Sequence, residues 1–248
     1  MKKVMKAIAA VMLTVAVVCA AGCKKTDDPN NGGNNGNNNG GNGGGGLNEH
    51  AYVDLGLPSG TLWATCNVGA ETPDGYGDYF AWGETTPKTT YNWSTYKYCK
   101  VNSDGRPSKL TKYNTSISYG TVDNLTLLQM RDDAATANWG SGWRTPTMEQ
   151  WEELVNNTTS TWTTQNGVNG RLFTANNGAS LFLPAAGGRW DSELVDAGYV
   201  GDYWSSSLYT DDPGSPKDAW DFYFDSGYYG VGDLYRYGGQ SVRAVREN

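Results

Sequence analysis

Aromatic and acidic side chains suited to ligand binding are concentrated in residues 185 to 220. This segment has no sustained apolar period, so the sequence predicts a long irregular stretch whose aromatic faces stay open to solvent. An open aromatic face beside a carboxylate suits a sugar, because the carboxylate accepts hydrogen bonds from hydroxyl groups. The alternative is that these aromatic residues only hold a long loop against the domain. The candidate ligand-binding residues are Trp190, Asp191, Tyr199, Tyr209, Asp211 and Asp212.

Catalytic chemistry has few candidate residues in this chain. The single histidine, His50, precedes the first expected strand, so no Ser–His or Cys–His pair and no histidine-based metal cluster is expected. Adjacent carboxylates such as Asp211 and Asp212 rarely face one substrate at the separation that glycoside hydrolysis needs. Glu84 follows an aromatic strand and could orient a ligand, but accepting backbone N–H groups in a tight turn is the stronger expectation. The sequence therefore favours a non-enzymatic protein.

One helix is signalled more clearly than any other element. Thr147 and Gln150 have the spacing of a capping box, in which each side chain accepts the other residue's backbone N–H. A helix is therefore expected to begin near Thr147 and to end at Asn156 and Asn157. Its apolar stripe consists of Met148, Trp151, Leu154 and Val155.

An earlier helix is expected within residues 122 to 139, with Asp123 as its cap. Asp132 and Asp133 would then lie near its C-terminal end, where the helix dipole disfavours negative charge. A partner such as Arg144 would compensate for that placement.

Short strands separated by turn residues account for most of the remaining chain. Asn166-Gly167 and Asn177-Gly178 lie between short apolar runs, and such pairs are strong hairpin signals. Strands are expected at residues 52–57, 61–66, 78–82, 220–224 and 241–246, a Tyr-rich hairpin between the last two, and loops over 87–120. Residues expected in the core are Trp143, Trp151, Phe182 and Trp204.

Composition sets the class of protein. All 10 Trp, 16 Tyr and 5 Phe residues lie after position 50, and the 33 Gly residues favour turns and short strands. The formal net charge is −7, or −10 without the three lysines in residues 1 to 22. An acidic domain repels nucleic acid, so DNA and RNA are excluded as partners.

The N-terminus predicts export and lipidation. Three lysines precede an uncharged stretch over residues 7–21, which is shorter than the roughly 20 residues of a membrane-spanning helix. The run Ala20-Ala21-Gly22-Cys23 resembles a lipobox, so residues 1–22 are expected to be a signal peptide and Cys23 to carry a lipid anchor. The alternative is ordinary cleavage that leaves Cys23 as a free thiol. Residues 23–50 are then a lipidated cysteine, an export signal and a flexible Asn/Gly-rich tether.

Several motifs in order resemble a known family. They are VDLGLPSGTLWATCNVGA, YGDYFAWGET, GSGWRTPTMEQWEEL, FLPAAGGRW, DYWSSS and SVRAVRE. Together they resemble the Fibrobacter succinogenes major paralogous domain, which is common in surface lipoproteins of Bacteroidetes. The resemblance covers roughly residues 52 to 247 and assigns this domain to residues 51–248. It implies an α+β, C-type-lectin-like fold of short antiparallel strands, two helices and long loops.

The resemblance also bears on function. Asp27 and Asp28 behind Cys23 resemble the surface-export signal of Bacteroidetes lipoproteins. Formylglycine-generating enzymes, which are distantly similar, use cysteines in the C-terminal part of the fold, whereas Cys66 and Cys99 lie in the first third of the domain here. Calcium is the one cofactor considered, because lectin-like folds often hold it with loop acids. The Glu-Pro-Asn and Gln-Pro-Asp signatures of sugar-bound calcium are missing, so solvated loop acids are expected instead.

These observations predict a lipid-anchored, surface-exposed outer-membrane protein that binds a glycan or a surface protein without turnover. The alternatives are a structural component of a surface assembly and a degenerate protein similar to formylglycine-generating enzymes. The membrane is expected to be contacted through the lipid anchor only.

A disulfide between Cys66 and Cys99 is also expected. They are the only cysteines of the domain, and exported proteins favour disulfides. Such a bond would contribute roughly 3 to 4 kcal/mol in the chain-entropy model. The alternative is two separate buried thiols.

Overall fold

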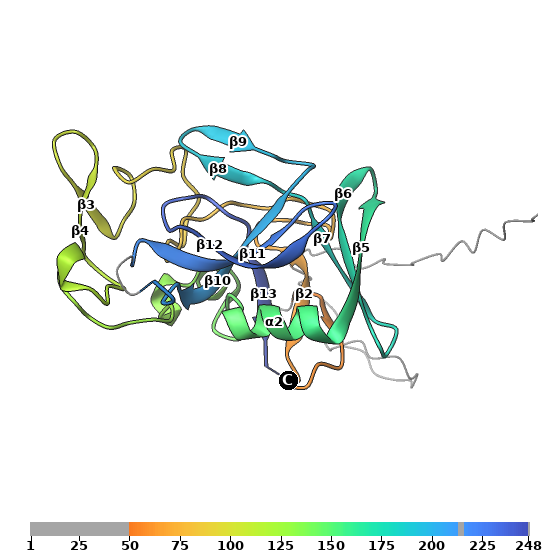
Figure 1. Cartoon of the computed structure of the whole chain (residues 1–248). Coiled ribbons are helices and arrows are strands. Elements are labelled where there is room, and N and C mark those ends of the chain that lie inside the picture. Colours follow the sequence, from red (N-terminus) through yellow and green to blue (C-terminus); the bar gives the residue numbers. More distant parts are fainter. Residues whose placement is uncertain (1–49, 213–215, 248) are drawn as a thin grey trace, which may run out of the picture.

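The computed structural model describes residues 50–212 and 216–247. Within them, antiparallel strands dominate and two short α-helices accompany them, so the fold is α+β, as expected (Figure 1). The expected signal peptide, Cys23, the expected export signal and nearly all of the expected tether lie outside the described residues. No helix among the described residues has both the length and the apolar character that crossing a membrane requires.

Three sheets of three strands form the body of the molecule, and each is antiparallel. The first joins β1 (Tyr52–Asp54), β2 (Leu62–Asn67) and β13 (Arg243–Arg246). The second joins β5 (Thr158–Gln165), β6 (Val168–Ala175) and β7 (Ser180–Pro184). The third joins β10 (Gly201–Leu208), β11 (Asp218–Phe224) and β12 (Tyr229–Tyr235).

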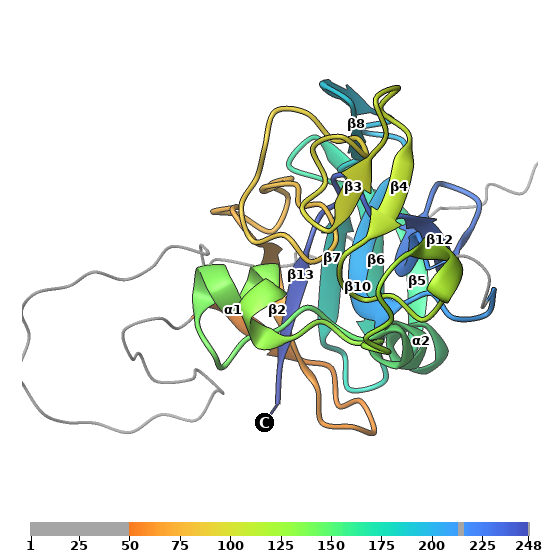
Figure 2. The same cartoon turned by 90° about the vertical axis from the view of Figure 1, so that its left-hand side faces the viewer.

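Two separate hairpins complete the sheets. They are β3 (Cys99–Val101) with β4 (Pro107–Leu110), and β8 (Gly188–Trp190) with β9 (Glu193–Val195). Both hairpins lie at the end of the molecule away from α2 (Figures 1 and 2). The helical elements are η1 (Ile117–Tyr119), η2 (Met130–Asp132), α1 (Ala134–Trp139) and α2 (Met148–Asn157).

The predicted capping box is confirmed at α2. The Thr147 hydroxyl accepts the N–H of Gln150 at 3.3 Å, and the Gln150 side chain accepts the N–H of Thr147 at 3.0 Å. Trp151 then points into the core, where its ring stacks on Phe222 at 4.6 Å and contacts Trp63 at 4.7 Å. Burial of such aromatic surface holds α2 against the β10–β11–β12 sheet.

Other expectations for strands and core are confirmed as well. Strand β1 pairs with β2, and the turn Asn166-Gly167 joins β5 to β6 with positive φ at both residues, as that two-residue hairpin requires. All four residues expected in the core, Trp143, Trp151, Phe182 and Trp204, are buried. The expected strand over 78–82 is not formed, because only Phe80 makes a bridge, with Gln240.

The earlier helix was predicted too long. Its α-helical part is α1, which begins after Asp133, and residues 126–128 extend along β10 instead, with Leu128 N–H donating to Ser206 O at 2.9 Å. Asp123 caps no helix, since its carboxylate accepts the N–H groups of Tyr113 and Asn114. Tertiary pairing has overridden a local helical spacing.

The acidic pair is placed differently as a result. Asp133 is the N-cap of α1, where its carboxylate accepts the N–H of Thr136 at 2.9 Å, a position the helix dipole favours. Asp132 is paired with Lys112 rather than Arg144, and Arg144 instead pairs with Glu247 at 3.0 Å. The prediction of Arg144 as partner was therefore wrong.

The predicted Cys66–Cys99 disulfide is absent, because Cys99 is a free thiol. Cys66 is buried in β2, which lies between β1 and β13, whereas Cys99 begins the separate β3–β4 hairpin. The Cys99 thiol donates to Lys100 O at 3.2 Å, and burial raises its pKa above the ordinary value.

Candidate functional site at the β8–β9 hairpin

Part of the segment expected to be irregular, residues 185 to 220, is regular structure. It contains β8, β9 and β10, and the last of these reads GDYWSSSL with Ser205, Ser206 and Ser207 all buried. A run of serines resembles a polar loop in sequence, although here it belongs to a buried strand. This correction changes which side chains the segment can offer to a ligand.

Backbone pairs on both edges hold the β8–β9 hairpin in place. Tyr91 and Asp191 exchange N–H···O bonds of 2.7 and 2.9 Å on one side, and Arg189 and Gly239 exchange bonds of the same lengths on the other. Gly187 enters the hairpin with φ of 62°, and a Cβ there would lie 2.1 Å from Val195 O. Only glycine fits that approach, so the hairpin is a rigid platform.

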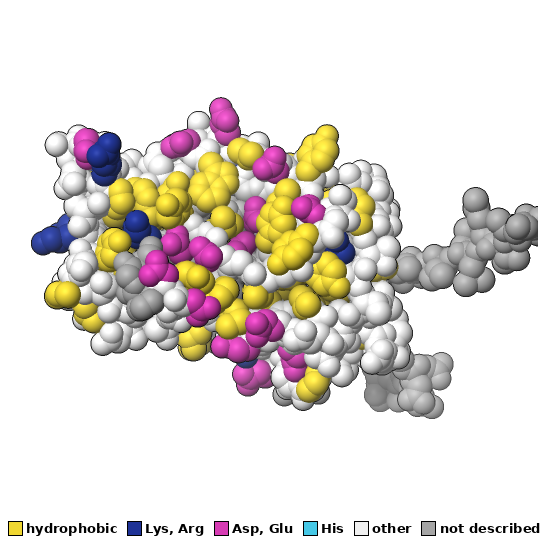
Figure 3. Space-filling model, viewed as in Figure 1, with side chains coloured by type: hydrophobic (Ala, Val, Ile, Leu, Met, Phe, Trp, Pro, Cys, Tyr) yellow, Lys and Arg dark blue, Asp and Glu magenta, His cyan; other side chains and the backbone are white. Residues whose placement is uncertain are grey.

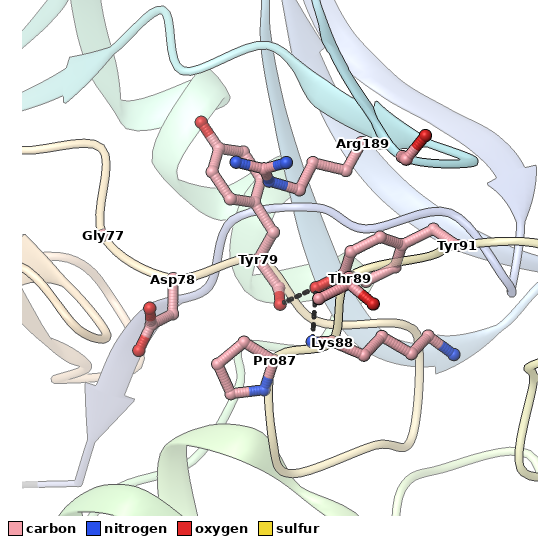
Figure 4. Close-up of a pocket in the computed structure, with 9 residues that line it drawn as sticks. Gly77, Asp78, Tyr79, Pro87, Lys88, Thr89, Tyr91 and Arg189 are labelled. Carbon is pink, nitrogen blue, oxygen red and sulfur yellow. Dashed lines mark hydrogen bonds between the residues drawn. The ribbon is translucent and has the colours of Figure 1, made fainter.

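Successive residues of a strand point to opposite faces, so Arg189 and Trp190 serve different surfaces. Arg189 enters a pocket of about 480 Å³ between the hairpin and the loop that carries Tyr79 and Tyr91 (Figure 4). This volume is within the roughly 300–1,000 Å³ typical of small-molecule sites.

Two tyrosines form the fixed walls of this pocket. The Tyr79 hydroxyl donates to Ala186 O at 2.6 Å. The Tyr91 hydroxyl donates to Tyr79 O at 2.6 Å and accepts the N–H of Lys88 at 3.1 Å (Figure 4). Burial is the main cause that raises the pKa of both phenols above the usual value. Neither phenol is therefore suited to act as a base at neutral pH.

The charged side chains around the pocket differ in whether they have a partner of opposite charge. Arg189 is half-buried with its guanidinium 5.1 Å from the centre of the Tyr79 ring, and no described residue forms a hydrogen bond or ion pair with that group. The Lys88 ammonium is already engaged by Glu84 at 2.9 Å. Asp78 is exposed, and its carboxylate points away from the Arg189 guanidinium in Figure 4. Arg189 therefore offers unused donors to the pocket.

Glu84 has the structural role that was expected for it. Its Oε1 accepts the N–H of Lys97 at 2.8 Å in addition to the Lys88 ammonium, and the residue is buried. It positions the loop beside the pocket.

Trp190 belongs to the opposite face of the hairpin, where four aromatic residues form a continuous row. We call Trp93, Trp190, Tyr235 and Tyr237 the aromatic row. The Trp190 ring meets Tyr237 at 5.5 Å, Tyr237 meets Trp93 at 4.9 Å and Tyr235 at 5.7 Å. Tyr235 is 45% exposed and the other three are half-buried. Hydrophobic and acidic side chains are interspersed on the face shown in Figure 3.

The other residues predicted to bind ligand do not join this row. Asp191 is a turn residue with φ of 51° whose carboxylate accepts the Asn92 amide at 2.8 Å. Tyr199 is 74% exposed in the turn before β10, and Tyr209 packs on Trp220 at 4.7 Å after the end of β10. Asp211 and Asp212 follow Tyr209 in the chain and are exposed. Burial is the first cause that raises the pKa of the Tyr209 phenol, and the charges of Asp233, Asp211 and Asp212 add to it. The six residues therefore occupy three places rather than one.

Two acids with raised pKa values lie on the β10–β11–β12 sheet. The register places Asp202 and Asp221 on the same face, diagonally across β10 and β11. Burial, followed by the charge of Asp196, raises the pKa of Asp202 to about 7. Burial, followed by the charges of Asp202 and Asp233, raises the pKa of Asp221 well above its usual range. These groups hold protons at a pH where ordinary aspartates are charged.

A metal site is not evident in the geometry. No group of three or more His, Cys, Asp or Glu side chains able to hold an ion occurs in residues 50–212 and 216–247. Arg189, Tyr79 and Tyr91 were not predicted as pocket residues. The run Gly187-Gly188-Arg189 could have indicated a site, because it places a cation after two glycines in an acidic chain.

Comparison with known proteins identified no relative. No protein-family model, no curated protein and no solved structure matched the chain. The site's chemistry must therefore be argued from its own residues.

Proposed function

We propose that this chain is a non-enzymatic carbohydrate-binding protein of the bacterial cell surface, anchored through a lipid on Cys23. We further propose that it belongs to the Fibrobacter succinogenes major paralogous domains and has a C-type-lectin-like fold. The sequence motifs support the family, and the two helices among short antiparallel strands support the fold.

The aromatic row is the observation that carries the binding proposal. A sugar ring has an apolar face of C–H groups, and a fixed, partly exposed aromatic surface can bury that face at little cost in conformational entropy. Trp190 is held by the close approach of Gly238, where a Cβ would lie 2.9 Å from the indole ring. The row is thus organised before any ligand arrives.

The proposal is tested by screening the purified full chain against immobilised glycans. Trp190→Ala and Tyr235→Ala should each weaken binding of the best glycan about tenfold or more, as expected for central aromatic contacts. Tyr228→Ala is the matched control, because Tyr228 is 59% exposed and lies outside the row. Circular dichroism should show that all three variants are folded.

The outcomes separate the candidate functions. Binding that survives both row variants would place the glycan elsewhere, and failure to bind any glycan would contradict the proposal. Stable self-association without glycan binding would instead support a structural component of a surface assembly.

The anchor has its own test. Cys23→Ala should release the protein from membranes, because the acyl chains would supply nearly all of its membrane affinity. Membrane retention of this variant in a cell fractionation experiment would contradict lipidation at Cys23.

A further inference from the structure

Arg189 combines restricted mobility with an unsatisfied charge. An arginine side chain stays charged in proteins and carries five N–H donors, which ordinarily find acceptors when solvent is partly excluded. Arg189 is half-buried as a residue, no acceptor among the described residues takes any of its donors, and its nitrogens stay open to the solvent in the pocket. A group in that state attracts an oxyanion from solution.

The pocket fixes the direction in which this charge is presented. Arg189 lies against the ring of Tyr79, whose hydroxyl is tied to Ala186 O. Its backbone is tied to Gly239 by two hydrogen bonds, so both ends of the side chain are constrained. A ligand therefore meets a guanidinium fork that needs little reorganisation.

The other polar groups indicate a small ligand with hydrogen-bonding substituents. The hydroxyl-bearing residues Thr89 and Ser192 line the same pocket, and Tyr91 closes it. Lys88 adds no free charge, because its ammonium is shared between Glu84 and Thr95 O. Asp78 also lines the pocket, but its carboxylate points away from the Arg189 guanidinium in Figure 4, so one cation faces a ligand and matches one anionic group.

The kind of anion follows from geometry and net charge. A planar carboxylate accepts two parallel N–H bonds from a guanidinium fork. A densely sulfated chain would be repelled by a protein with a formal net charge of −7, whereas a single anion needs only the one guanidinium that faces it. A small monocarboxylate is therefore favoured over a polysulfated chain.

We propose that the Arg189 pocket is a second binding site, which takes the carboxylate of a small organic acid on the face of β8 opposite the aromatic row. Uronic acids and amino acids both carry this group at a suitable size. The proposal does not depend on glycan binding by the aromatic row, because a different surface and different residues carry it.

The test is calorimetric titration of the full chain with matched pairs of probes. Glucuronate and galacturonate are each compared with their methyl esters, and a set of amino acids is compared with the corresponding amides. At least one carboxylate should bind about tenfold more tightly than its neutral partner, since a charge-assisted contact is lost. Whichever series shows this difference identifies the source of the carboxylate.

Variants assign the effect to the pocket. Arg189→Gln should abolish the preference for the carboxylate, and Arg189→Lys should retain only part of it, because an ammonium lacks the planar fork. Arg106→Gln is the control, since the Arg106 side chain is 83% exposed on the β3–β4 hairpin. Trp190→Ala should leave the preference unchanged.

Several results would overturn this assignment. Equal affinity for acid and neutral partner in every pair, no binding of any probe, or a preference that persists in Arg189→Gln would each do so. Tighter binding of glucose sulfate than of every carboxylate would contradict the class of anion. Loss of carboxylate binding in Trp190→Ala would show that the two faces of the hairpin are one site.

Discussion

The surroundings of Arg236 and of Arg189 differ in how their charges are satisfied. Arg236 is fully buried after β12, and it donates to the Tyr96 hydroxyl at 3.0 Å and to the carbonyls of Tyr113, Pro216 and Lys112 at 2.8 to 3.0 Å. Arg189 is less buried, yet no described residue forms a hydrogen bond or ion pair with its guanidinium, which lies against the Tyr79 ring. A charge that the fold has fully satisfied holds the fold together, and one left unsatisfied is available to a ligand.

Two acidic groups of the molecule show a similar contrast. Near Arg236, burial alone would raise the pKa of Asp132, but hydrogen bonds from Lys112, Tyr98 and Tyr113 outweigh it and lower the pKa to about 2. On the β10–β11–β12 sheet, burial raises the pKa of Asp202 to about 7, since no hydrogen bond from a described residue compensates for it. The first carboxylate stabilises the fold as an anion, whereas the second costs stability when it loses its proton.

The largest expected effect separates the two arginines. Arg236→Met should destabilise the protein by about 3 to 5 kcal/mol, because it leaves several buried carbonyls without donors. Arg189→Met should change the free energy of unfolding by less than about 0.5 kcal/mol, as for most surface substitutions. Urea unfolding of both variants makes this measurement. Equal destabilisation by the two changes would remove the distinction between a structural and a binding arginine.

A pH titration tests the acids of the β10–β11–β12 sheet. Folded Asp202 keeps its proton up to a pKa of about 7, whereas the unfolded chain releases it near the ordinary value of 3.8. The contribution of this group to the free energy of unfolding is therefore fully present below about pH 4. It decreases as the pH rises to about 7, by at most about 1.4 kcal/mol per pH unit. Unfolding free energies measured from pH 5 to 8 should fall by about 2 to 3 kcal/mol from Asp202, and Asp221 adds to this decrease.

Asp202→Asn supplies the control for that titration, because an amide has no proton to release. Its stability should fall less over the same window, with the remaining decrease due to Asp221. A wild-type stability that rises from pH 5 to 8 would contradict the assignment of a protonated Asp202.

Asp132 should behave in the opposite way. Its lowered pKa contributes stability that is present above about pH 4 and is lost as the pH falls toward 2. Asp132→Asn should therefore cost about 2 kcal/mol at pH 7 and progressively less in acid. Thermal unfolding of this variant at pH 7 and pH 3 measures the difference. An equal loss at both values would show that the charge of Asp132 is not what stabilises this region.

The smallest expected effect concerns Tyr199. Its side chain is 74% exposed and lies outside both the aromatic row and the Arg189 pocket. Tyr199→Ala should change the free energy of unfolding by less than about 0.5 kcal/mol and leave glycan affinity unchanged. A large loss of glycan binding in this variant would return Tyr199 to the site that the sequence assigned to it.

Local chemistry explains which elements could be predicted from the sequence. The capping box at Thr147 and Gln150 and the turn at Asn166-Gly167 depend on neighbouring residues only, so their signals are complete within a few positions. The core residue Trp151 was also predictable, because its place on the helix fixes which way it points. None of these features needs a distant part of the chain.

The errors arose where distant partners decide the structure. Leu128 pairs with Ser206 across 78 positions rather than completing a helix, and the buried Ser205 is in a strand whose neighbours supply the apolar surroundings. The candidate site followed the same rule. Trp190 was predicted, but Arg189 and Tyr79 meet only because the β8–β9 hairpin lies over the earlier loop, and no local pattern reports that contact.

The most direct test of carbohydrate binding at the aromatic row uses the indole N–H signals of tryptophan. The best glycan from the screen is titrated into isotope-labelled protein, and the signals of Trp93, Trp190 and Trp220 are followed by nuclear magnetic resonance. Trp220 serves as the internal reference, because it packs on Tyr209 at the other predicted location. The proposal predicts that Trp93 and Trp190 shift with the ligand while Trp220 stays in place. Movement of Trp220 with no change at Trp93 and Trp190 would contradict it.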